Sequence, residues 1–324
     1  MKEIAKVEFA HLPTPVERLP RLSEYLGGPE LLIKRDDQTG LATGGNKTRK
    51  LEYLLAEAQT LGADTLITTG AVQSNHCRQT AAAAARGGFD CILVLAGERP
   101  DVVTGNLLLD QLYGAEVVWT TREARDETLQ QVFAETLSSG RSTYLVPYGG
   151  SNATGACSYT FAIQELLMQG VQADWIVFAS SSGGTQAGMV VGAQLFEFSG
   201  QVLGISVDEQ AEVLQARVAE LASAVADFLG EDLVFGSEDI CVNADYLGGG
   251  YGVVSETEQE AIRLFARKEG ILLDPVYTGR AAGGMIDLIR RGFFSSNEVV
   301  LFWHTGGIPA LFAEKYRGVV TGDQ

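Results

Sequence analysis

Short apolar runs alternate with helix-like stretches along most of the chain. In CILVLAG (residues 91–97) and DWIVFAS (174–180) the apolar residues stand at consecutive positions rather than at every second one, and DTLITTG (64–70) has a shorter apolar run at Leu66 and Ile67. This pattern is typical of strands that are buried on both faces of a parallel sheet. A loop rich in Gly, Ser, Thr or Asn follows most runs, and a stretch with helical periodicity comes next. The alternation predicts an α/β fold with open, twisted parallel sheets covered by helices.

Two helices are marked especially clearly. The apolar positions of the first recur at i, i+3, i+4 and i+7, and they are Leu51, Leu54, Leu55 and Ala58. This spacing predicts an amphipathic helix that begins at Lys47 and stops at Gly62. Residues 256–269 show the same kind of apolar face, and Gly270 marks the end of that helix.

Composition and charge exclude several classes of partner. The 324 residues are 46% hydrophobic and 20% charged, as in ordinary globular proteins, and the net charge is −17. So acidic a surface repels nucleic acid and anionic membranes, and no run reaches the roughly 18–20 apolar residues of a membrane span. Four dispersed cysteines and three histidines lack metal-site spacing. We therefore expect a cytoplasmic protein without a bound metal, a nucleic-acid partner or a membrane partner.

A lysine placed directly after a glycine turn is the first candidate for chemistry. The chain has only seven lysines, and Lys47 follows Gly44, Gly45 and Asn46 where a helix should begin. Glycines at such a turn let the backbone approach a ligand closely. Lys50, one turn further on, is expected to be solvated. Lys34 ends a likely strand and is expected to pair with Asp36 or Asp37.

A second candidate is the loop from Ser180 to Gly188, which follows an apolar strand and opens a helix. Its small residues and free backbone N–H groups at a helix N-terminus are suited to a phosphate group, although a plain tight turn is the alternative. The Walker pattern fails by one residue after Gly45, and GGTQAG lacks the middle glycine of the dinucleotide fingerprint. A single phosphate with a nearby lysine predicts pyridoxal phosphate as the cofactor.

Five segments carry a resemblance to a known family. They are GGNKTRKLEYLLAEA, TTGAVQSNHCRQTAA, GGTQAGMVVG, GILLDPVYTGRAAGGMIDLIRRG and HTGGIPALFA. Together they resemble the D-cysteine desulfhydrase and 1-aminocyclopropane-1-carboxylate (ACC) deaminase family of pyridoxal-phosphate enzymes, which have the tryptophan-synthase β-subunit fold (fold type II). The resemblance implies two α/β domains with the cofactor in the cleft between them. The smaller domain would span residues 46–162, the larger would take 1–45 and 163–324, and the protein would be a homodimer.

The resemblance also implies a role for each matching residue. Lys47 would bind the cofactor covalently and then move the Cα proton of a small amino-acid substrate. The substrate carboxylate and the ring hydroxyl would contact Ser74, Asn75 and His76. The phosphate would be held by Ser182, Gly183, Gly184 and Thr185. Tyr251 and Tyr277 match two active-site tyrosines that are available for stacking and proton transfer.

The two subfamilies differ at the ring nitrogen of the cofactor. ACC deaminases resemble this chain but carry Glu where it has Thr278 and an apolar residue where it has Thr305. Threonine hydroxyls near the ring nitrogen suit a weaker electron sink, which is sufficient for β-elimination with a good leaving group. We therefore predict a D-cysteine desulfhydrase.

Three alternatives stay open. One is an L-cysteate sulfo-lyase, in which Arg78, His76 or Thr48 would supply extra donors for the sulfonate; Arg78 is otherwise expected at the surface or in a salt bridge. The others are an ACC deaminase and a catalytically silent ligand-binding protein. The intact Lys47 and Ser74 argue against a silent protein.

Overall fold

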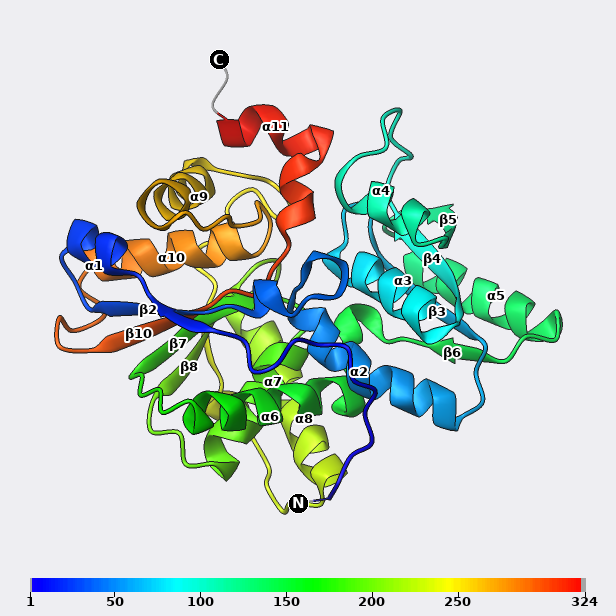
Figure 1. The fold of residues 1–324 in the computed structure, drawn as a ribbon, viewed down its shortest axis with the longest axis horizontal. Helices are drawn as coiled ribbons and strands as arrows, with labels where there is room; N and C mark the ends of the chain where they lie inside the picture. The colour runs from blue at the N-terminus through cyan, green and yellow to red at the C-terminus, as the bar shows by residue number, and fades with distance from the viewer. Residues whose placement is uncertain (1, 322–324) are drawn as a thin grey trace.

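A computed structural model describes residues 2–321 of the chain. It contains one sheet of six strands and one of four, each with helices on both faces (Figure 1). The α/β prediction is confirmed. None of the helices within residues 2–321 has the length and apolar character needed to cross a membrane.

The larger sheet has the strand order β1-β2-β10-β7-β8-β9. Its strands are β1 (Val16–Arg18), β2 (Glu30–Lys34), β10 (Val299–Trp303), β7 (Trp175–Ser180), β8 (Gln201–Ser206) and β9 (Cys241–Asn243). All neighbours are parallel except β1, which pairs with β2 in the antiparallel sense. The expected parallel arrangement is therefore confirmed, with one short antiparallel strand at this edge. An edge strand of three residues can reverse direction because only one neighbour constrains it.

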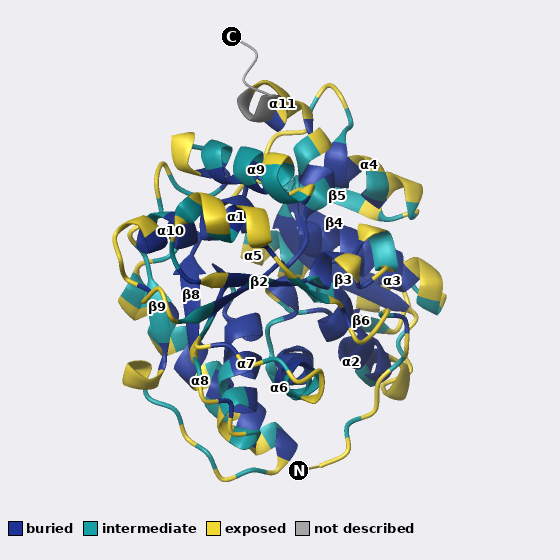
Figure 2. Ribbon diagram, turned by 60° about the vertical axis from the view of Figure 1, so that its left-hand side comes forward, coloured by how far each residue is buried: buried dark blue, intermediate teal, exposed yellow. Residues whose placement is uncertain are grey.

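Two groups of helices cover the larger sheet. One face carries α1 (Pro20–Leu26), α9 (Glu256–Glu269) and α10 (Thr278–Arg290), and the other carries α6 (Ala153–Met168), α7 (Gly184–Leu195) and α8 (Ala211–Leu229) (Figure 1). Between them the central strands β10, β7 and β8 are buried apart from their first residues, whereas the edge strands β1 and β9 are partly exposed (Figure 2). The predicted helix 256–269 is confirmed. Ser255 and Glu258 form its capping box, and Gly270 ends it in the left-handed conformation.

The smaller sheet has the order β5-β4-β3-β6, and every pair is parallel. Its strands are β3 (Thr65–Ala71), β4 (Asp90–Ala96), β5 (Glu116–Thr120) and β6 (Thr143–Leu145). The surrounding helices are α2 (Asn46–Thr60), α3 (Asn75–Gly87), α4 (Gly105–Leu112) and α5 (Arg125–Ser138). The C-terminal part of the described chain contributes α11 (Glu314–Thr321). Short 3-10 turns occur at Asp36–Gln38, Leu41–Thr43, Tyr148–Gly150, Ser237–Asp239 and Ile308–Phe312.

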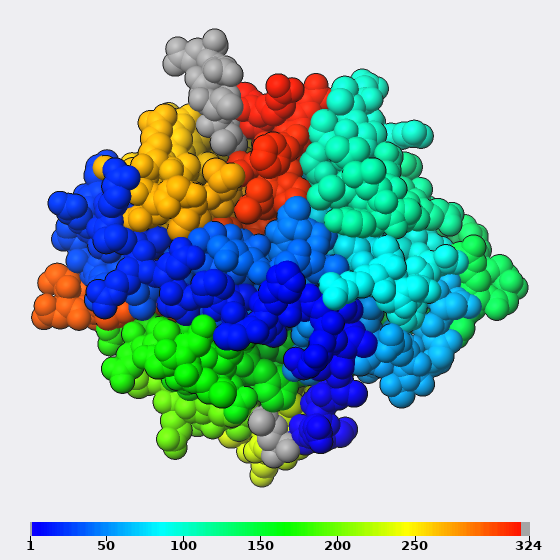
Figure 3. Space-filling view, in the orientation of Figure 1, coloured from blue at the N-terminus to red at the C-terminus, as the bar shows by residue number. Residues whose placement is uncertain are grey.

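The strands of the smaller sheet all lie between residues 65 and 145, inside the range 46–162 expected for the smaller domain. The exact boundaries stay a prediction. Helix α6 spans the second boundary, and it packs on α2 as well as on α7. The N-terminal segment crosses the surface between the two parts (Figure 3), where the backbone N–H of Val7 donates to Glu52 O of α2.

A buried network of charges ties the two parts together at the start of α2. Arg49 of α2 donates to Asp36 Oδ1 at 2.8 Å and to Glu165 Oε2 of α6 at 2.8 Å. Lys34, at the end of β2, also donates to Glu165, at 2.5 Å. Lys34 and Asp36 are fully buried, and Arg49 is 3% exposed. The salt bridge of Lys34 is therefore with Glu165, not with Asp36 or Asp37 as expected, because Asp37 is already paired with Arg35.

We expect Asp36→Asn to lower the free energy of unfolding by about 3 kcal/mol or more, because it removes one of the two counter-charges of the buried Arg49. Chemical denaturation followed by circular dichroism measures the change. The matched control is Glu260→Gln, which breaks an exposed pair with Arg290 and should cost at most about 1 kcal/mol. Equal effects of the two substitutions would contradict this account of the network.

Candidate active site

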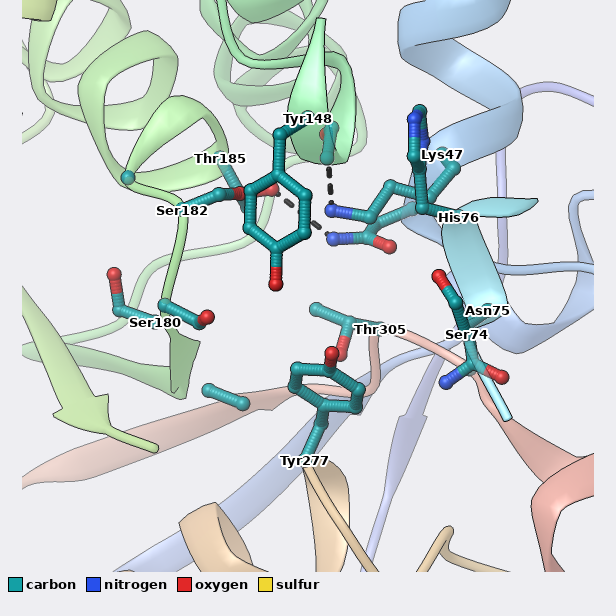
Figure 4. A pocket seen from close by; sticks show the side chains of 16 residues that line it. Lys47, Ser74, Asn75, His76, Tyr148, Ser180, Ser182, Thr185, Tyr277 and Thr305 are labelled. Carbon is teal, nitrogen blue, oxygen red and sulfur yellow. Dashed lines mark hydrogen bonds between the residues drawn. The ribbon is translucent and has the colours of Figure 1, made fainter. Parts of the chain in front are cut away.

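One pocket gathers most of the side chains singled out by the sequence. It lies at the carboxyl ends of strands from both sheets and encloses about 610 Å³ of empty space, open solvent included. Ligands bind at this edge of open α/β sheets because loops and helix N-termini converge there. The lining residues are Asn46, Lys47, Ser74, Asn75, His76, Tyr148, Gly149, Ala179, Ser180, Ser181, Ser182, Gly183, Thr185, Tyr277, Thr305 and Gly306 (Figure 4).

Lys47 lies on the first turn of α2, as the sequence predicted. The glycine turn before it is required by close packing: a Cβ at Gly44, where φ is +75°, would lie 1.9 Å from the carbonyl oxygen of Asp37. Lys47 Nζ donates to the carbonyl oxygen of Gly149 at 3.1 Å (Figure 4). Burial lowers the pKa of Lys47 to about 8. A substantial fraction of this amine is therefore neutral, and hence nucleophilic, at physiological pH.

Lys50 is fully buried, so the expectation that it is solvated is wrong. Its Nζ donates to the same carbonyl oxygen of Gly149 at 3.1 Å and to Ser151 Oγ at 3.3 Å. Burial, together with the charge of Lys47, holds the pKa of Lys50 well below its ordinary value. Both amines contact the same neutral carbonyl oxygen here, so a bound anion would stabilise their protonated forms.

The loop from Ser182 to Thr185 connects β7 with α7 and faces these lysines. Gly183 has a φ of +85°, and the backbone N–H of Gly184 donates to Ser151 Oγ at 3.2 Å. A Cβ at Gly184 would lie 2.9 Å from Lys50 Nζ, which shows how closely the second lysine approaches the loop. Thr185 Oγ1 accepts from Asn46 Nδ2 at 3.1 Å. The start of a twelve-residue helix and a buried amine together form an anion site.

Ser74, Asn75 and His76 stand at the start of α3, on the opposite wall. Ser74 caps the helix, and its Oγ accepts from the backbone N–H of Cys77 at 3.2 Å. His76 Nε2 is hydrogen-bonded to Thr68 Oγ1 at 2.8 Å, and burial, with a smaller contribution from Lys47 and Lys50, lowers the pKa of the imidazole well below its ordinary value. The imidazole is therefore neutral.

Tyr277 faces the pocket, and Tyr251 stands behind it. Their hydroxyl oxygens are 2.7 Å apart, and burial raises the pKa of both phenols well above the ordinary value. Thr305 lines the pocket, but Thr278 does not. The hydroxyl of Thr278 donates to Asp274 Oδ1 at 2.8 Å and accepts from the backbone N–H of Asp274 at 2.7 Å. That hydroxyl has no proton left to donate to a cofactor ring, so the expected contact of Thr278 lacks a donor.

Comparison with known proteins agrees with this geometry. The family model described as "Pyridoxal-phosphate dependent enzyme" matches residues 7–306. The chain belongs to this family. The fold is that of fold type II pyridoxal-phosphate enzymes, and the cofactor is pyridoxal phosphate.

Three solved structures resemble this pyridoxal-phosphate enzyme. A crystal structure of an ACC deaminase homologue is 38% identical, with a TM-score of 0.90 over 99% of this chain and 96% of that chain. A pyridoxal 5'-phosphate-dependent aspartate racemase is 20% identical, with a TM-score of 0.65 over 91% and 90% of the two chains. Threonine deaminase isoform 2 from Solanum lycopersicum is 16% identical, with a TM-score of 0.68 over 95% and 82%. The last two show the fold alone.

The residues present fit the cofactor. Lys47 offers a buried amine for the aldehyde, while Lys50 and the start of α7 offer an anion site for the phosphate. Ser180 Oγ and His76 Nδ1, which belong to residues that line the pocket, are buried and have no hydrogen-bond partner among the described residues. Buried polar atoms of this kind are normally satisfied, so a ligand is the natural partner for them.

Several pocket residues were not found from the sequence. Tyr148 lines the pocket (Figure 4), and the guanidinium of Arg125 lies 4.9 Å from the centre of its ring. The PYGG turn after β6 repeats the pattern of strand, glycine loop and helix, and this pattern could have revealed it.

Arg78, expected at the surface or in a salt bridge, is fully buried and donates to oxygens of Asn75, Asn106 and Gly44 instead. Within residues 2–321 no cluster of His, Cys, Asp or Glu could hold a metal ion.

We expect Lys47 to capture added pyridoxal phosphate at a rate that rises with pH and has a midpoint near 8, because only the neutral amine attacks an aldehyde and the pKa of Lys47 is lowered to about 8. The visible absorbance of the covalently bound cofactor measures this rate in apoprotein. Lys47→Ala should abolish the signal, and Lys268→Ala, which removes a remote lysine, should not change it. A midpoint near the ordinary lysine pKa would contradict the role of burial.

Lys50→Met should weaken binding of pyridoxal phosphate by about 10- to 100-fold, the usual effect of losing a hydrogen bond to a charged group. Binding of pyridoxal, which lacks the phosphate, should change less than twofold. Equilibrium titration of apoprotein with each compound tests this. An equal loss for both compounds would mean that Lys50 supports Lys47 or the fold rather than the phosphate.

Proposed function

We propose that the protein is a β-elimination lyase that converts D-cysteine and water to pyruvate, ammonia and hydrogen sulfide. The observation that carries this proposal is the chemistry of the pocket lining. Of the described residues that line it, Lys47 is the only lysine or arginine, and none is an aspartate or glutamate. Hydroxyls, amides and the neutral imidazole of His76 supply the remaining polar side-chain groups, which suits a small substrate whose side chain is uncharged.

The carboxylate of the amino acid would bind at the start of α3. Ser74 and Asn75 line the pocket there, and the helix dipole favours an anion. Pyridoxal phosphate supplies an aldehyde that bonds to the substrate amine and a ring that withdraws electrons from the α-carbon. The absence of a carboxylate from the described pocket lining supports a ring nitrogen that is not held protonated, with Thr305 as the neighbouring hydroxyl.

The elimination would use three proton-transfer groups. Lys47 Nζ would take the Cα proton, and the electron pair of that bond would form the Cα=Cβ double bond. The Cβ–S bond would break, and the sulfur would leave with its electron pair and take a proton from Tyr277 Oη. Tyr251, 2.7 Å from Tyr277, would return a proton to it. Burial raises the pKa of both phenols, so both are protonated at neutral pH and Tyr277 can donate a hydrogen bond to the departing sulfur. The released enamine would hydrolyse to pyruvate and ammonia.

The two other reactions are less well supported. A sulfonate from L-cysteate would need cationic donors, but the N–H groups of Arg78 are directed to Asn75, Asn106 and Gly44. ACC deamination is favoured by one observation, the 38% identity to a structure of an ACC deaminase homologue. It is the second candidate. A cytoplasmic homodimer is proposed on the family resemblance alone, and light scattering would test the dimer.

The experiment is product release from D-cysteine, L-cysteine, L-cysteate and ACC by the purified holoenzyme under identical conditions. We expect sulfide and pyruvate from D-cysteine in equal amounts, at a rate at least tenfold above those of the other three substrates. Release of sulfite from L-cysteate as the main product would still support β-elimination, but with sulfite as the leaving group. If 2-oxobutyrate from ACC were the main product, the interpretation of the pocket lining would be wrong.

A further inference from the structure

Arg78 lies one turn after Asn75 on α3, outside the pocket lining and fully buried. Its Nη1 donates to Asn75 Oδ1 at 2.9 Å and to Asn106 Oδ1 at 2.7 Å, and its Nη2 donates to the carbonyl oxygen of Gly44 at 2.9 Å. All three acceptors are neutral. A buried guanidinium that binds only neutral oxygens is unusual, because charged groups are seldom buried without a paired opposite charge.

The contact with Asn75 fixes which way its side-chain amide points. Asn75 Oδ1 accepts from Arg78 Nη1 and also from Asn106 Nδ2, each at 2.9 Å. A flipped amide would turn its own N–H groups toward these two donors, which is strongly unfavourable. The amide nitrogen is therefore turned toward the pocket (Figure 4). A Cβ at Gly307 would lie 2.7 Å from that nitrogen, so the loop after β10 limits its movement on the other side.

The contact with Gly44 links the same guanidinium to the turn that positions Lys47. Gly44 stands three residues before Lys47, and its carbonyl oxygen accepts from Nη2. The planar guanidinium makes these bonds in different directions at the same time, whereas a lysine would offer one compact ammonium. Arg78 thus sets the position of Asn75 relative to Lys47.

The charge of Arg78 adds to this effect. Burial lowers its pKa to about 10, so it stays protonated at neutral pH. Asp110 of α4 and Asp274 are the carboxylates that act on it through space, and neither is hydrogen-bonded to it. The positive charge therefore lies behind the start of α3, where it increases the attraction for an anion in the pocket.

We propose that Arg78 is a positioning residue that presents the amide N–H groups of Asn75 to the carboxylate of the amino-acid substrate. The proposal rests on the proposed function only in that the ligand is an amino acid. It does not depend on which group leaves from Cβ. Loss of the Arg78 guanidinium should weaken recognition of the carboxylate and leave recognition of the amine unchanged.

The test is equilibrium binding to the holoenzyme, followed by its visible absorbance, with two ligands that have no leaving group on Cβ. Alanine, tested as both the D- and the L-enantiomer, has an amine and a carboxylate, whereas alaninol has the amine only. In Arg78→Lys, which keeps the charge but loses the planar fork, alanine should bind at least tenfold more weakly and alaninol within twofold of wild type. Arg86→Lys, on the exposed side of the same helix, is the matched control and should change neither.

Three results would overturn the proposal: equal losses for both ligands, no loss for alanine, or wild-type protein that binds alanine no better than alaninol. Combining Arg78→Lys with Asn75→Ala should weaken alanine binding less than twofold beyond Asn75→Ala alone, because Arg78 acts through Asn75. If Arg78→Lys folds poorly, Asn106→Ala removes the other donor to Asn75 Oδ1 and should give the same selective loss. Failure to release sulfide from D-cysteine would refute the proposed reaction but would not affect this result.

Discussion

The ion pairs that Arg49 makes with Asp36 and Glu165 determine where Lys47 lies. Arg49 is two residues after Lys47 on the same helix, and its two partners come from the turn after β2 and from α6. Asp36 is held further by Tyr159 and Trp303, at 2.6 and 2.8 Å. A buried charge must meet its partner in one geometry, whereas apolar side chains can slide past one another. The network therefore fixes both the rotation and the depth of α2, and with them the position of Lys47.

Burial then gives the site its chemistry. Lys47 and Lys50 share the carbonyl oxygen of Gly149, and neither amine has a carboxylate within hydrogen-bonding distance among the described residues. An isolated pair of this kind favours the neutral amine, which is the form that reacts with an aldehyde, and it attracts an anion to balance the remaining charge. The same two lysines would be inert if they were solvated. The fold supplies reactivity by excluding water from a helix face that its sequence alone would assign to solvent.

The sequence contains the local parts of this site but not its long-range contacts. The strand ends, the helix start at Lys47 and the loop from Ser182 to Thr185 follow from patterns within a few residues, and they are where the sequence predicts them. The burial of Lys50 depends instead on Gly150, about a hundred residues away, where a Cβ would lie 3.3 Å from Lys50 Cδ. No periodicity within α2 carries that information. A family resemblance supplies the residue types at matching positions, but it does not show which hydroxyls are already hydrogen-bonded within the protein. Thr278 was expected to contact the cofactor because its hydrogen bonds with Asp274 cannot be read from the sequence.

The hydrogen bonds of Asp274 keep its carboxylate out of the pocket. Asp274 lies just before Tyr277, yet its side chain accepts from the backbone N–H groups of Val276, Tyr277 and Thr278 and from the Thr278 hydroxyl. Because these four donors already satisfy the carboxylate, it gains little by turning toward a ligand. Asp208 is also hydrogen-bonded within the protein, and its Oδ2 accepts from Ser181 Oγ at 2.9 Å. Neither acid is among the described residues that line the pocket, whereas the hydroxyl-bearing Thr305 is. A lining without a carboxylate is consistent with the weaker electron sink on which the proposed β-elimination depends. Thr305 and the saturated Asp274 are therefore two separate observations that support that proposal.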